Sequence, residues 1–360
     1  MTDKSKLPKS ALAALDLYCR KASARTLKRL AFSLGAALGV NKSSLRNNIL
    51  TQAHALEELS KIKLAKGKVC ITSIDLGISN FAYAKFELSS TNDLPKLMDW
   101  NKFHLEEQFL QPYGEKMSLH PTDTSQVVYD LCEFLTSQAD LPDMFTIERQ
   151  RARSMSSRAI LEPILKVNIL EQILFSNLIN KTKCHVPNKL DYMVVSSDPQ
   201  RMTSFWTSFS PIIGVTEQPN QKDSKDMNPK NSSNRLSKSI KIDTVKHILQ
   251  GAVGIGDNKM IQLLGDWEAR LGSFIPGNPK FKITDCVPLG PTAGVRKDDD
   301  LADSFLHGLA WMEWFKFYEQ IRKILLKESG KYDQGVLEDF NKHIKNNKFD
   351  FPNLQLEKAK

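Results

Sequence analysis

The spacing of apolar and polar residues divides the chain into a helical first part and a mixed remainder. Between residues 8 and 66, leucines and other apolar residues recur every three or four positions, which predicts amphipathic helices. Gly39 interrupts this pattern, Asn41 or Ser43 can cap the helix that follows, and Gly67 ends it. Residues 8–66 are therefore predicted to form a compact helical module.

After Gly67 the pattern changes to short apolar runs, typical of strands, which alternate with helical periodicity. The order is β-β-β-α-β-α-β followed by helices, which predicts an α/β fold with a mixed sheet flanked by helices. The expected strands are Val69–Ser79, Asn80–Leu88, Lys96–Leu105, Asp143–Glu148 and Tyr192–Ser196. The expected helices are Ser125–Ser137, Ile160–Leu178, Ile240–Leu249, Met260–Arg270 and Asp300–Tyr318, the last with an aromatic stripe that indicates core packing.

Two stretches lack the apolar residues of a core. Residues 216–239 are rich in Asn, Ser and Lys, which is typical of a flexible insertion. The Lys-rich end of the chain is interpreted as an extension over 326–360. The predicted organisation is a helical module over 8–66, an α/β domain over 67–325 that carries the insertion, and this extension.

Charge and cysteine content narrow the classes of function. The net charge of +9 favours a polyanionic partner such as nucleic acid or an acidic membrane surface. The five cysteines are widely spaced and form no CxxC pair, which indicates reduced thiols and argues against a zinc site or a disulfide framework. No apolar run reaches transmembrane length. The first residues do not resemble a secretory signal, whereas the basic, amphipathic stretch Leu12–Leu30 leaves an uncleaved mitochondrial import signal open.

Carboxylates stand where apolar elements begin or end. Asp75 and Glu148 each follow an apolar run, and Asp299, Asp300 and Asp303 open an apolar helix. Acidic residues at a helix start also complement the helix dipole, but this does not explain an aspartate on the face that should turn inward. Carboxylates on strand ends and helix starts commonly hold Mg²⁺ at a phosphodiester. These five residues are the predicted catalytic set.

The segment IDLGISN around Asp75 also resembles the phosphate-binding turn of actin-like ATPases and sugar kinases. Those folds need a second such turn and a glycine-rich adenosine loop, and the sequence contains neither. The nuclease interpretation is therefore favoured over the kinase one.

Arginines cluster directly after Glu148, in a Ser-rich loop, and the planar guanidinium fork suits phosphate oxygens. The alternative is that they form salt bridges within the fold. The candidate DNA-binding residues are Arg149, Arg151, Arg153 and Arg158 in this loop, Lys28 and Lys42 in the helical module, Arg201, and Lys297. The helical module itself suits contacts to the DNA backbone or, equally, simple packing on the main domain.

Five segments together resemble the fungal mitochondrial Holliday-junction resolvases, the yeast cruciform-cutting endonucleases, which are relatives of bacterial RuvC. The resemblance covers about residues 12–320 and rests on IDLGISN, MFTIERQRARSMSSR, VNILEQILF, SSDPQRMTSFW and GVRKDDDLADSFLH. It implies a ribonuclease-H-like fold with an N-terminal SAP-like module. It also implies a homodimer that resolves four-way DNA junctions by paired symmetric nicks during mitochondrial DNA recombination, with no small-molecule cofactor.

The resemblance implies an Mg²⁺-dependent site, with Mn²⁺ as a substitute, held by Asp75, Glu148, Asp300 and Asp303. The run Asp298–Asp300 leaves open which aspartate takes the metal-binding position, so Asp299 remains a candidate ligand. The helix over 160–178 is expected at the dimer interface, although packing on its own sheet accounts for much of its apolar character. Two alternatives remain: another nuclease of the same fold, of the integrase or ribonuclease-H type, or a non-catalytic junction-binding protein with structural carboxylates.

Overall fold

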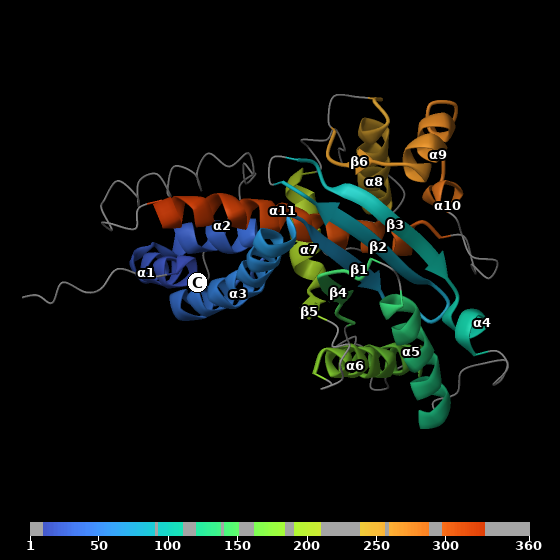
Figure 1. The fold of residues 1–360 in the computed structure, drawn as a ribbon, viewed down its shortest axis with the longest axis horizontal. Coiled ribbons are helices and arrows are strands. Elements are labelled where there is room, and N and C mark those ends of the chain that lie inside the picture. The colour runs from blue at the N-terminus through green and yellow to red at the C-terminus, as the bar shows by residue number, and fades with distance from the viewer. Residues whose placement is uncertain are drawn as a thin grey trace, which may run out of the picture. The chain divides into compact units, whose positions relative to one another are not determined.

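The computed structural model describes residues 10–90, 93–110, 120–137, 140–150, 162–183, 191–209, 238–255, 259–287 and 297–327 (Figure 1). The chain forms two compact units. The helical unit contains Met1–Gly67, Arg201–Leu236 and Ala310–Lys360, and the sheet unit contains Lys68–Gln200 and Ser237–Leu309. Most of the predicted insertion, residues 216–237, and the end of the chain from residue 328 lie outside the described residues.

The sheet unit is built on six strands in the order β5-β4-β1-β2-β3-β6. Their bounds are β1 Val69–Asp75, β2 Phe81–Leu88, β3 Lys96–Phe103, β4 Met144–Glu148, β5 Met193–Ser197 and β6 Gln262–Leu263. The first three strands form an antiparallel meander, β4 runs parallel to β1, and β5 runs parallel to β4. All five predicted strands are therefore present, and the prediction of a mixed sheet is confirmed.

Helices flank this sheet. Their bounds are α4 Leu105–Phe109, α5 Pro121–Thr136, α6 Glu162–Lys183, α8 Lys238–Ala252, α9 Asp266–Phe274, α10 Ile283–Cys286 and the start of α11 Asp299–Lys327. The prediction of a helix over Met260–Arg270 was wrong, because Gln262 pairs with β3 and Gly265, at φ 55°, precedes α9. Within the described part, no helix combines the length and apolarity that crossing a bilayer requires.

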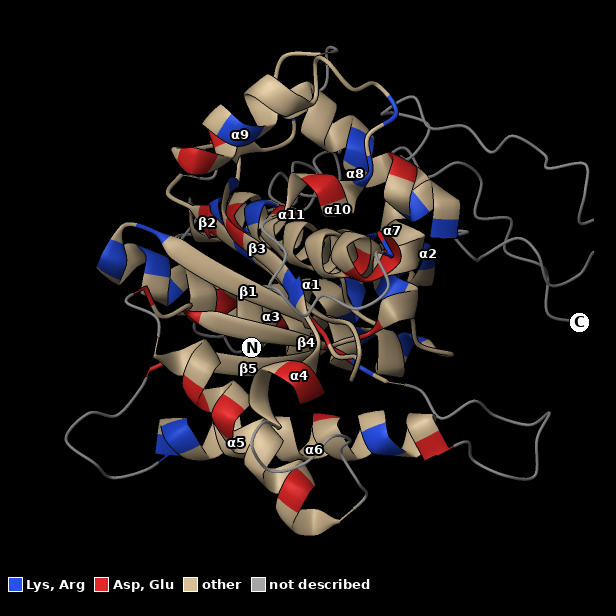
Figure 2. Ribbon diagram, turned by 90° about the vertical axis from the view of Figure 1, so that its right-hand side faces the viewer, with Lys and Arg blue, Asp and Glu red and all other residues tan. Residues whose placement is uncertain are grey.

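The two faces of the sheet are covered by different helices. Helices α5 and α6 lie side by side on one face in Figures 1 and 2, and Ile74, Phe145 and Ile147 belong to the core beneath them. On the other face the Ser73 hydroxyl donates to the Ser304 carbonyl of α11 at 2.5 Å. A Cβ at Gly308 would lie 2.6 Å from the Ser73 hydroxyl oxygen, so the glycine permits the close approach of α11 to β1.

The helical unit begins with α1 Ala11–Lys21, α2 Ala24–Leu34 and α3 Lys42–Lys66. The predicted capping of α3 by Asn41 and its end at Gly67 are confirmed, with a reciprocal capping box at Asn41. The expectation that the preceding helix runs to Gly39 was wrong. It ends at Gly35, which adopts φ 71°, and a Cβ there would meet the Trp314 ring at 2.2 Å.

The helical unit also contains most of α7 Pro199–Phe209 and the second part of α11. The predicted α/β domain over 67–325 includes both segments. Their aromatic side chains are the reason for the difference: the Phe205 and Trp314 rings pack edge to face at 5.5 Å, and Phe32 of α2 packs on Phe205. The aromatic stripe of α11 is buried, which confirms its prediction as core.

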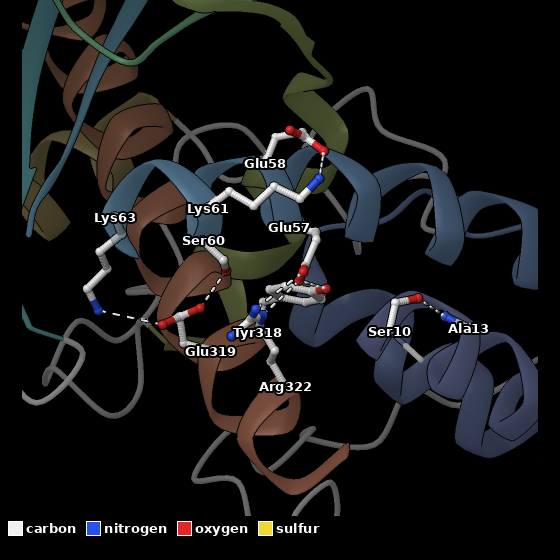
Figure 3. A network of polar contacts seen from close by, with 10 residues as sticks. All are labelled: Ser10, Ala13, Glu57, Glu58, Ser60, Lys61, Lys63, Tyr318, Glu319 and Arg322. Atoms are coloured by element: carbon white, nitrogen blue, oxygen red, sulfur yellow. Dashed lines mark hydrogen bonds and ion pairs between the residues drawn. The ribbon is translucent and has the colours of Figure 1, made fainter. Parts of the chain in front are cut away.

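A polar network ties α3 to the second part of α11 (Figure 3). Glu57 accepts hydrogen bonds from the Tyr318 hydroxyl at 2.7 Å and the Arg322 guanidinium at 2.9 Å. One turn away, the Ser60 hydroxyl donates to Glu319, whose other oxygen lies 3.6 Å from Lys63 Nζ. Both of these buried glutamates are thus matched by donors.

Candidate active site

The sheet brings Asp75 and Glu148 side by side. Strands β1 and β4 are parallel neighbours, and Ile74 pairs with Ile147. Each acidic residue follows its paired isoleucine directly and ends its strand. Because side chains alternate along a strand, both carboxylates point away from the core that holds Ile74 and Ile147, toward the face covered by α11.

The first turns of α11 bring the third carboxylate to this face. Ligand oxygens of Asp75, Glu148 and Asp303 all lie within 4.8 Å of one another. The close packing of Ser304 on Ser73 fixes the height of Asp303 above the strand ends. In the part of the chain that the structure describes, this is the one acidic, His or Cys cluster with the spacing of a metal site.

The cluster is electrostatically unfavourable as a set of bare carboxylates. Burial, and then the charges of Glu148, Asp303 and Asp300, raise the pKa of Asp75 well above its ordinary value. Burial also raises the pKa of Asp303, against the opposing effect of Lys241. Like charges this close repel unless a cation lies among them.

Two basic side chains contact the cluster, and neither is among the predicted site residues. Lys241 Nζ of α8 lies 2.5 Å from Asp303 Oδ1. His307 Nε2 lies 3.3 Å from Glu148 Oε2, while His307 Nδ1 shares a 2.7 Å hydrogen bond with the Ser197 hydroxyl of β5. The only sequence signal for His307 is its position one helical turn after Asp303; Lys241 carries none, because its helix comes from a distant part of the chain.

The acidic run before Asp303 is divided among separate partners. Asp298 accepts a hydrogen bond from the Thr284 backbone at 3.0 Å. Asp299 pairs with Lys238, and Asp300 lies 2.7 Å from Lys102 Nζ, whose side chain is 1% exposed. The Asp300 charge still contributes to the raised pKa of Asp75. The structure thus brings three of the five predicted acids together and holds Asp299 and Asp300 on lysines beside them.

The donor set of the cluster fits a divalent cation. Mg²⁺ prefers carboxylate oxygens, and usually takes further ligands from water or substrate phosphate. Three partly buried carboxylates supply such oxygens from one direction, and a cation would relieve the repulsion that raises the pKa of Asp75. The residues that would hold it are Asp75, Glu148 and Asp303.

The predicted DNA-binding residues have different surroundings. Arg149 is exposed, and its backbone N–H donates to the Ser197 carbonyl, directly after Glu148. The Arg201 guanidinium donates to the Gly35 carbonyl at 2.6 Å, inside the helical unit. Lys42 and Lys297 are exposed and Lys28 is half-buried. The remaining predicted contacts, Arg151, Arg153 and Arg158, lie outside the described residues.

The segment that follows Glu148 is held from α6. The buried Glu171 carboxylate accepts a hydrogen bond from the Gln150 backbone at 3.0 Å. Burial raises the pKa of Glu171, and the hydrogen bond from Gln150 and the nearby Arg149 charge oppose that shift. Glu171 belongs to the segment VNILEQILF. Because its carboxylate binds the backbone just after β4, it positions the end of that strand.

The apolar character of α6 is mostly explained by its own unit. Leu170, Leu174 and Leu178 are fully buried in the core that covers the sheet. Leu170 and Leu174 therefore fill the core of their own unit, and the expected dimer interface on this helix would have to use other residues. Leu165, at 39% exposed, is the large apolar residue of α6 that remains open.

Cysteine chemistry plays no part in the described site. Four of the five cysteines, Cys19, Cys70, Cys132 and Cys286, are free and buried, as predicted for reduced structural thiols, and Cys184 lies outside the described residues. Burial raises the pKa of each of the four buried thiols to about 12. They are therefore poor nucleophiles and poor metal ligands at neutral pH.

Comparisons with known proteins identify relatives that match most of this chain. A family model described as "Mitochondrial resolvase Ydc2 / RNA splicing MRS1" matches residues 71–321. The mitochondrial cruciform cutting endonuclease 1 of Saccharomyces cerevisiae is 46% identical over 87% of this chain and 88% of the relative. The mitochondrial RNA-splicing protein MRS1 of Saccharomyces paradoxus is 25% identical over 97% of this chain and 95% of the relative.

A solved structure shares the fold. The crystal structure of the yeast mitochondrial Holliday junction resolvase Ydc2 aligns with a TM-score of 0.50 at 18% identity, over 85% of this chain and 99% of that one. The family match spans β1 to α11 and so includes all three clustered carboxylates. The chain belongs to the family of the mitochondrial resolvase Ydc2 and the RNA-splicing protein MRS1.

Proposed function

We propose that this protein is a structure-specific endonuclease that resolves four-way DNA junctions in mitochondria by paired symmetric nicks. The observation that carries the proposal is the cluster of Asp75, Glu148 and Asp303, whose ligand oxygens lie within 4.8 Å of one another. The 46% identity to a cruciform cutting endonuclease supports the junction as substrate and the mitochondrion as location. The net charge of +9 suits a DNA partner.

The side chains have separable roles in phosphodiester hydrolysis. Asp75, Glu148 and Asp303 would hold Mg²⁺, for which Mn²⁺ would substitute, and Asp300 beside them is a further candidate ligand. When bound, such ions lower the pKa of an attacking water and stabilise the leaving oxygen. His307 holds the Glu148 carboxylate in place through its own bond to Ser197. Arg149, exposed beside Glu148, contacts the phosphate backbone.

The fold class and the N-terminal module are parts of the same proposal. An antiparallel meander of three strands followed by two parallel strands, with acids at the ends of β1 and β4, supports a ribonuclease-H-like domain. The helical module over 8–66 is proposed to be SAP-like, and Lys42, exposed at the start of α3, supports DNA contact there. The 8–66, 67–325 and 326–360 boundaries remain predictions.

The enzyme is proposed to act as a homodimer. A four-way junction has approximate two-fold symmetry, so a two-fold dimer offers one site to each opposed strand. The first turns of α6 are the proposed contact, because Leu165 is exposed there and Ile169 is only half-buried. Figure 2 shows acidic and basic residues interspersed along the same helix, which suits a self-complementary surface.

The variant Leu165→Glu tests this contact, and Ser176→Glu is its control because it adds the same charge to an exposed position of α6. We expect Leu165→Glu to sediment as a monomer and to convert a supercoiled cruciform plasmid into nicked circles instead of linear product. Ser176→Glu should remain dimeric. A dimeric Leu165→Glu protein places the interface elsewhere.

A second function has support from the comparisons, since MRS1 proteins match almost the full chain at 25% identity. Binding of intron RNA without hydrolysis would not require the acidic cluster. Incubation of purified protein with a mobile four-way junction, a matched linear duplex and a structured RNA, with Mg²⁺ or EDTA, separates the two. The resolvase proposal predicts Mg²⁺-dependent paired nicks in the junction alone; RNA binding with no cleavage of any substrate contradicts it.

A further inference from the structure

Lys241 of α8 pairs directly with Asp303, a member of the carboxylate cluster. Its side chain is 15% exposed, and its Nζ lies 2.5 Å from Asp303 Oδ1. Burial lowers the pKa of Lys241, but the charges of Asp303, Glu148 and Asp75 raise it above the ordinary lysine value. The position of the lysine ammonium against Asp303 therefore makes it a counter-charge to the carboxylates.

The other lysines near the acidic run differ from Lys241 in one respect. Lys238, at 79% exposed, pairs with Asp299, and Lys102 pairs with Asp300. Neither of those aspartates belongs to the group of three carboxylates. Lys241 alone among these three lysines pairs with a member of the cluster, and its charge also opposes the raised pKa of Asp75.

We propose that Lys241 is a built-in counter-ion, which holds the three carboxylates together when no divalent ion is present and opposes the binding of that ion. The inference rests on the proposed metal site. A fixed positive charge beside a cation site lowers its affinity for a second cation, and the two ligands are coupled reciprocally. Metal binding then requires the Lys241–Asp303 contact to weaken.

The consequence is a site that keeps its shape before it is loaded. Without a cation, the three carboxylates would either separate or take up protons. With Lys241 in place the strand ends and α11 keep their packing, while weaker metal binding avoids permanent occupation. Lys241 is in this sense a positioning residue for the carboxylates.

Two measurements on the full chain test the inference. The first is thermal unfolding in EDTA at pH 7.5, where Lys241→Met should unfold about 3 °C below the wild type. In an Asp303→Asn background the same substitution should have little effect, because the charge that Lys241 compensates is gone. An equal loss in both backgrounds would show that Lys241 acts only through packing and would overturn the proposal.

The second measurement is Mn²⁺ titration by calorimetry. Lys241→Met should bind Mn²⁺ about tenfold more tightly than the wild type or better. Lys246→Met is the matched control, since it removes the same charge from the same helix at a lysine that lies over the Phe281 ring, and its affinity should stay within about twofold. Equal or weaker Mn²⁺ binding by Lys241→Met overturns the inference. Lys241→Gln, which keeps a hydrogen-bond donor, replaces Lys241→Met if the latter does not fold.

The two proposals fail in different ways. If the wild type binds no Mn²⁺ and cuts no junction, the proposed metal site fails, while the unfolding experiment in EDTA still decides whether Lys241 compensates the carboxylates. If the wild type binds Mn²⁺ and cuts, but Lys241→Met shows neither change, the metal site stands and the counter-ion role is excluded.

Discussion

The helical unit and the sheet unit each bury acidic side chains, but they treat them in opposite ways. In the helical unit, Glu57 receives donors from Tyr318 and Arg322, and Glu319 receives donors from Ser60 and Lys63. Both of these buried carboxylates have partners of their own, as buried charges in stable folds require.

The sheet unit also gives single buried acids such as Glu171 a donor, but at the ends of β1 and β4 it gathers three carboxylates against one another. Asp75, Glu148 and Asp303 share one lysine and one histidine, and mutual repulsion adds to burial in raising the pKa of Asp75. An arrangement that costs stability and is kept by the packing of α11 on β1 indicates a functional site. The contrast teaches that pairing, and not burial, distinguishes structural acids from candidate catalytic ones.

The largest effect is expected for Asp75→Asn. Loss of a metal ligand removes several kcal/mol of transition-state stabilisation, so junction cutting should fall by about 10³-fold or more. Junction binding should persist, because Arg and Lys supply the phosphate contacts. Gel-based cleavage and mobility-shift assays on one labelled junction measure both, and a variant that still nicks in Mg²⁺ is incompatible with the assignment.

Substitution of His307 tests whether the carboxylate cluster depends on the residues that orient it. His307→Gln loses the fixed orientation of Glu148, and changes of this kind typically cost about 10- to 100-fold in metal affinity or activity. We expect weaker Mn²⁺ binding and slower cutting. Ser197→Ala, which removes only the hydrogen bond to His307, should give a smaller loss in the same direction. Full metal affinity in both variants would mean that the histidine only fills space.

Glu57→Gln tests the paired carboxylates of the helical unit. It leaves Arg322 without its carboxylate, and hydrogen bonds to charged groups contribute about 1.5–3 kcal/mol, so unfolding in urea should show a loss of about 2 kcal/mol. Because Glu57 belongs to the matched network, the Mn²⁺ affinity of the folded protein should not change. A loss of Mn²⁺ binding without a loss of stability would contradict the structural role of this network.

The pH dependence of stability should separate the same two groups of acids. The folded-state pKa of Asp75 is raised, so its contribution favours the folded state at acidic pH and is lost as pH rises through that pKa. In EDTA, Asp75→Asn should therefore be more stable than the wild type at pH 7.5, by on the order of 1 kcal/mol. The difference should vanish near pH 4, and urea titrations at the two pH values measure it; a gain that is the same at both would point to packing instead of charge.

The sequence predicts the carboxylates of the site better than it predicts the residues that hold those carboxylates in place. Asp75 and Glu148 could be identified because each ends an apolar strand, and Asp303 because a carboxylate on the inward face of a helix has no structural explanation. Lys241, His307 and Ser197 could not, because their contacts join α8, α11 and β5, and no local pattern encodes such distant pairs.

The errors in the predicted fold have the same origin, because they also depend on contacts between distant parts of the chain. Leucine spacing continued past Gly35, and only the Trp314 ring, far along the chain, shows why α2 ends there. Leu170 and Leu174 are apolar for their own core, which a helix with apolar residues on several faces does not reveal. Periodicity reports that a residue is buried, whereas the identity of its neighbour requires the tertiary structure.

The central claim is that the three carboxylates are held together for a divalent ion. Anomalous diffraction from crystals of the full chain soaked in Mn²⁺ tests it most directly. The account predicts an anomalous peak at coordination distance from Asp75, Glu148 and Asp303, which disappears in crystals of Asp75→Asn. A well-occupied Mn²⁺ elsewhere with none between these carboxylates, or a peak that the substitution leaves unchanged, would contradict it.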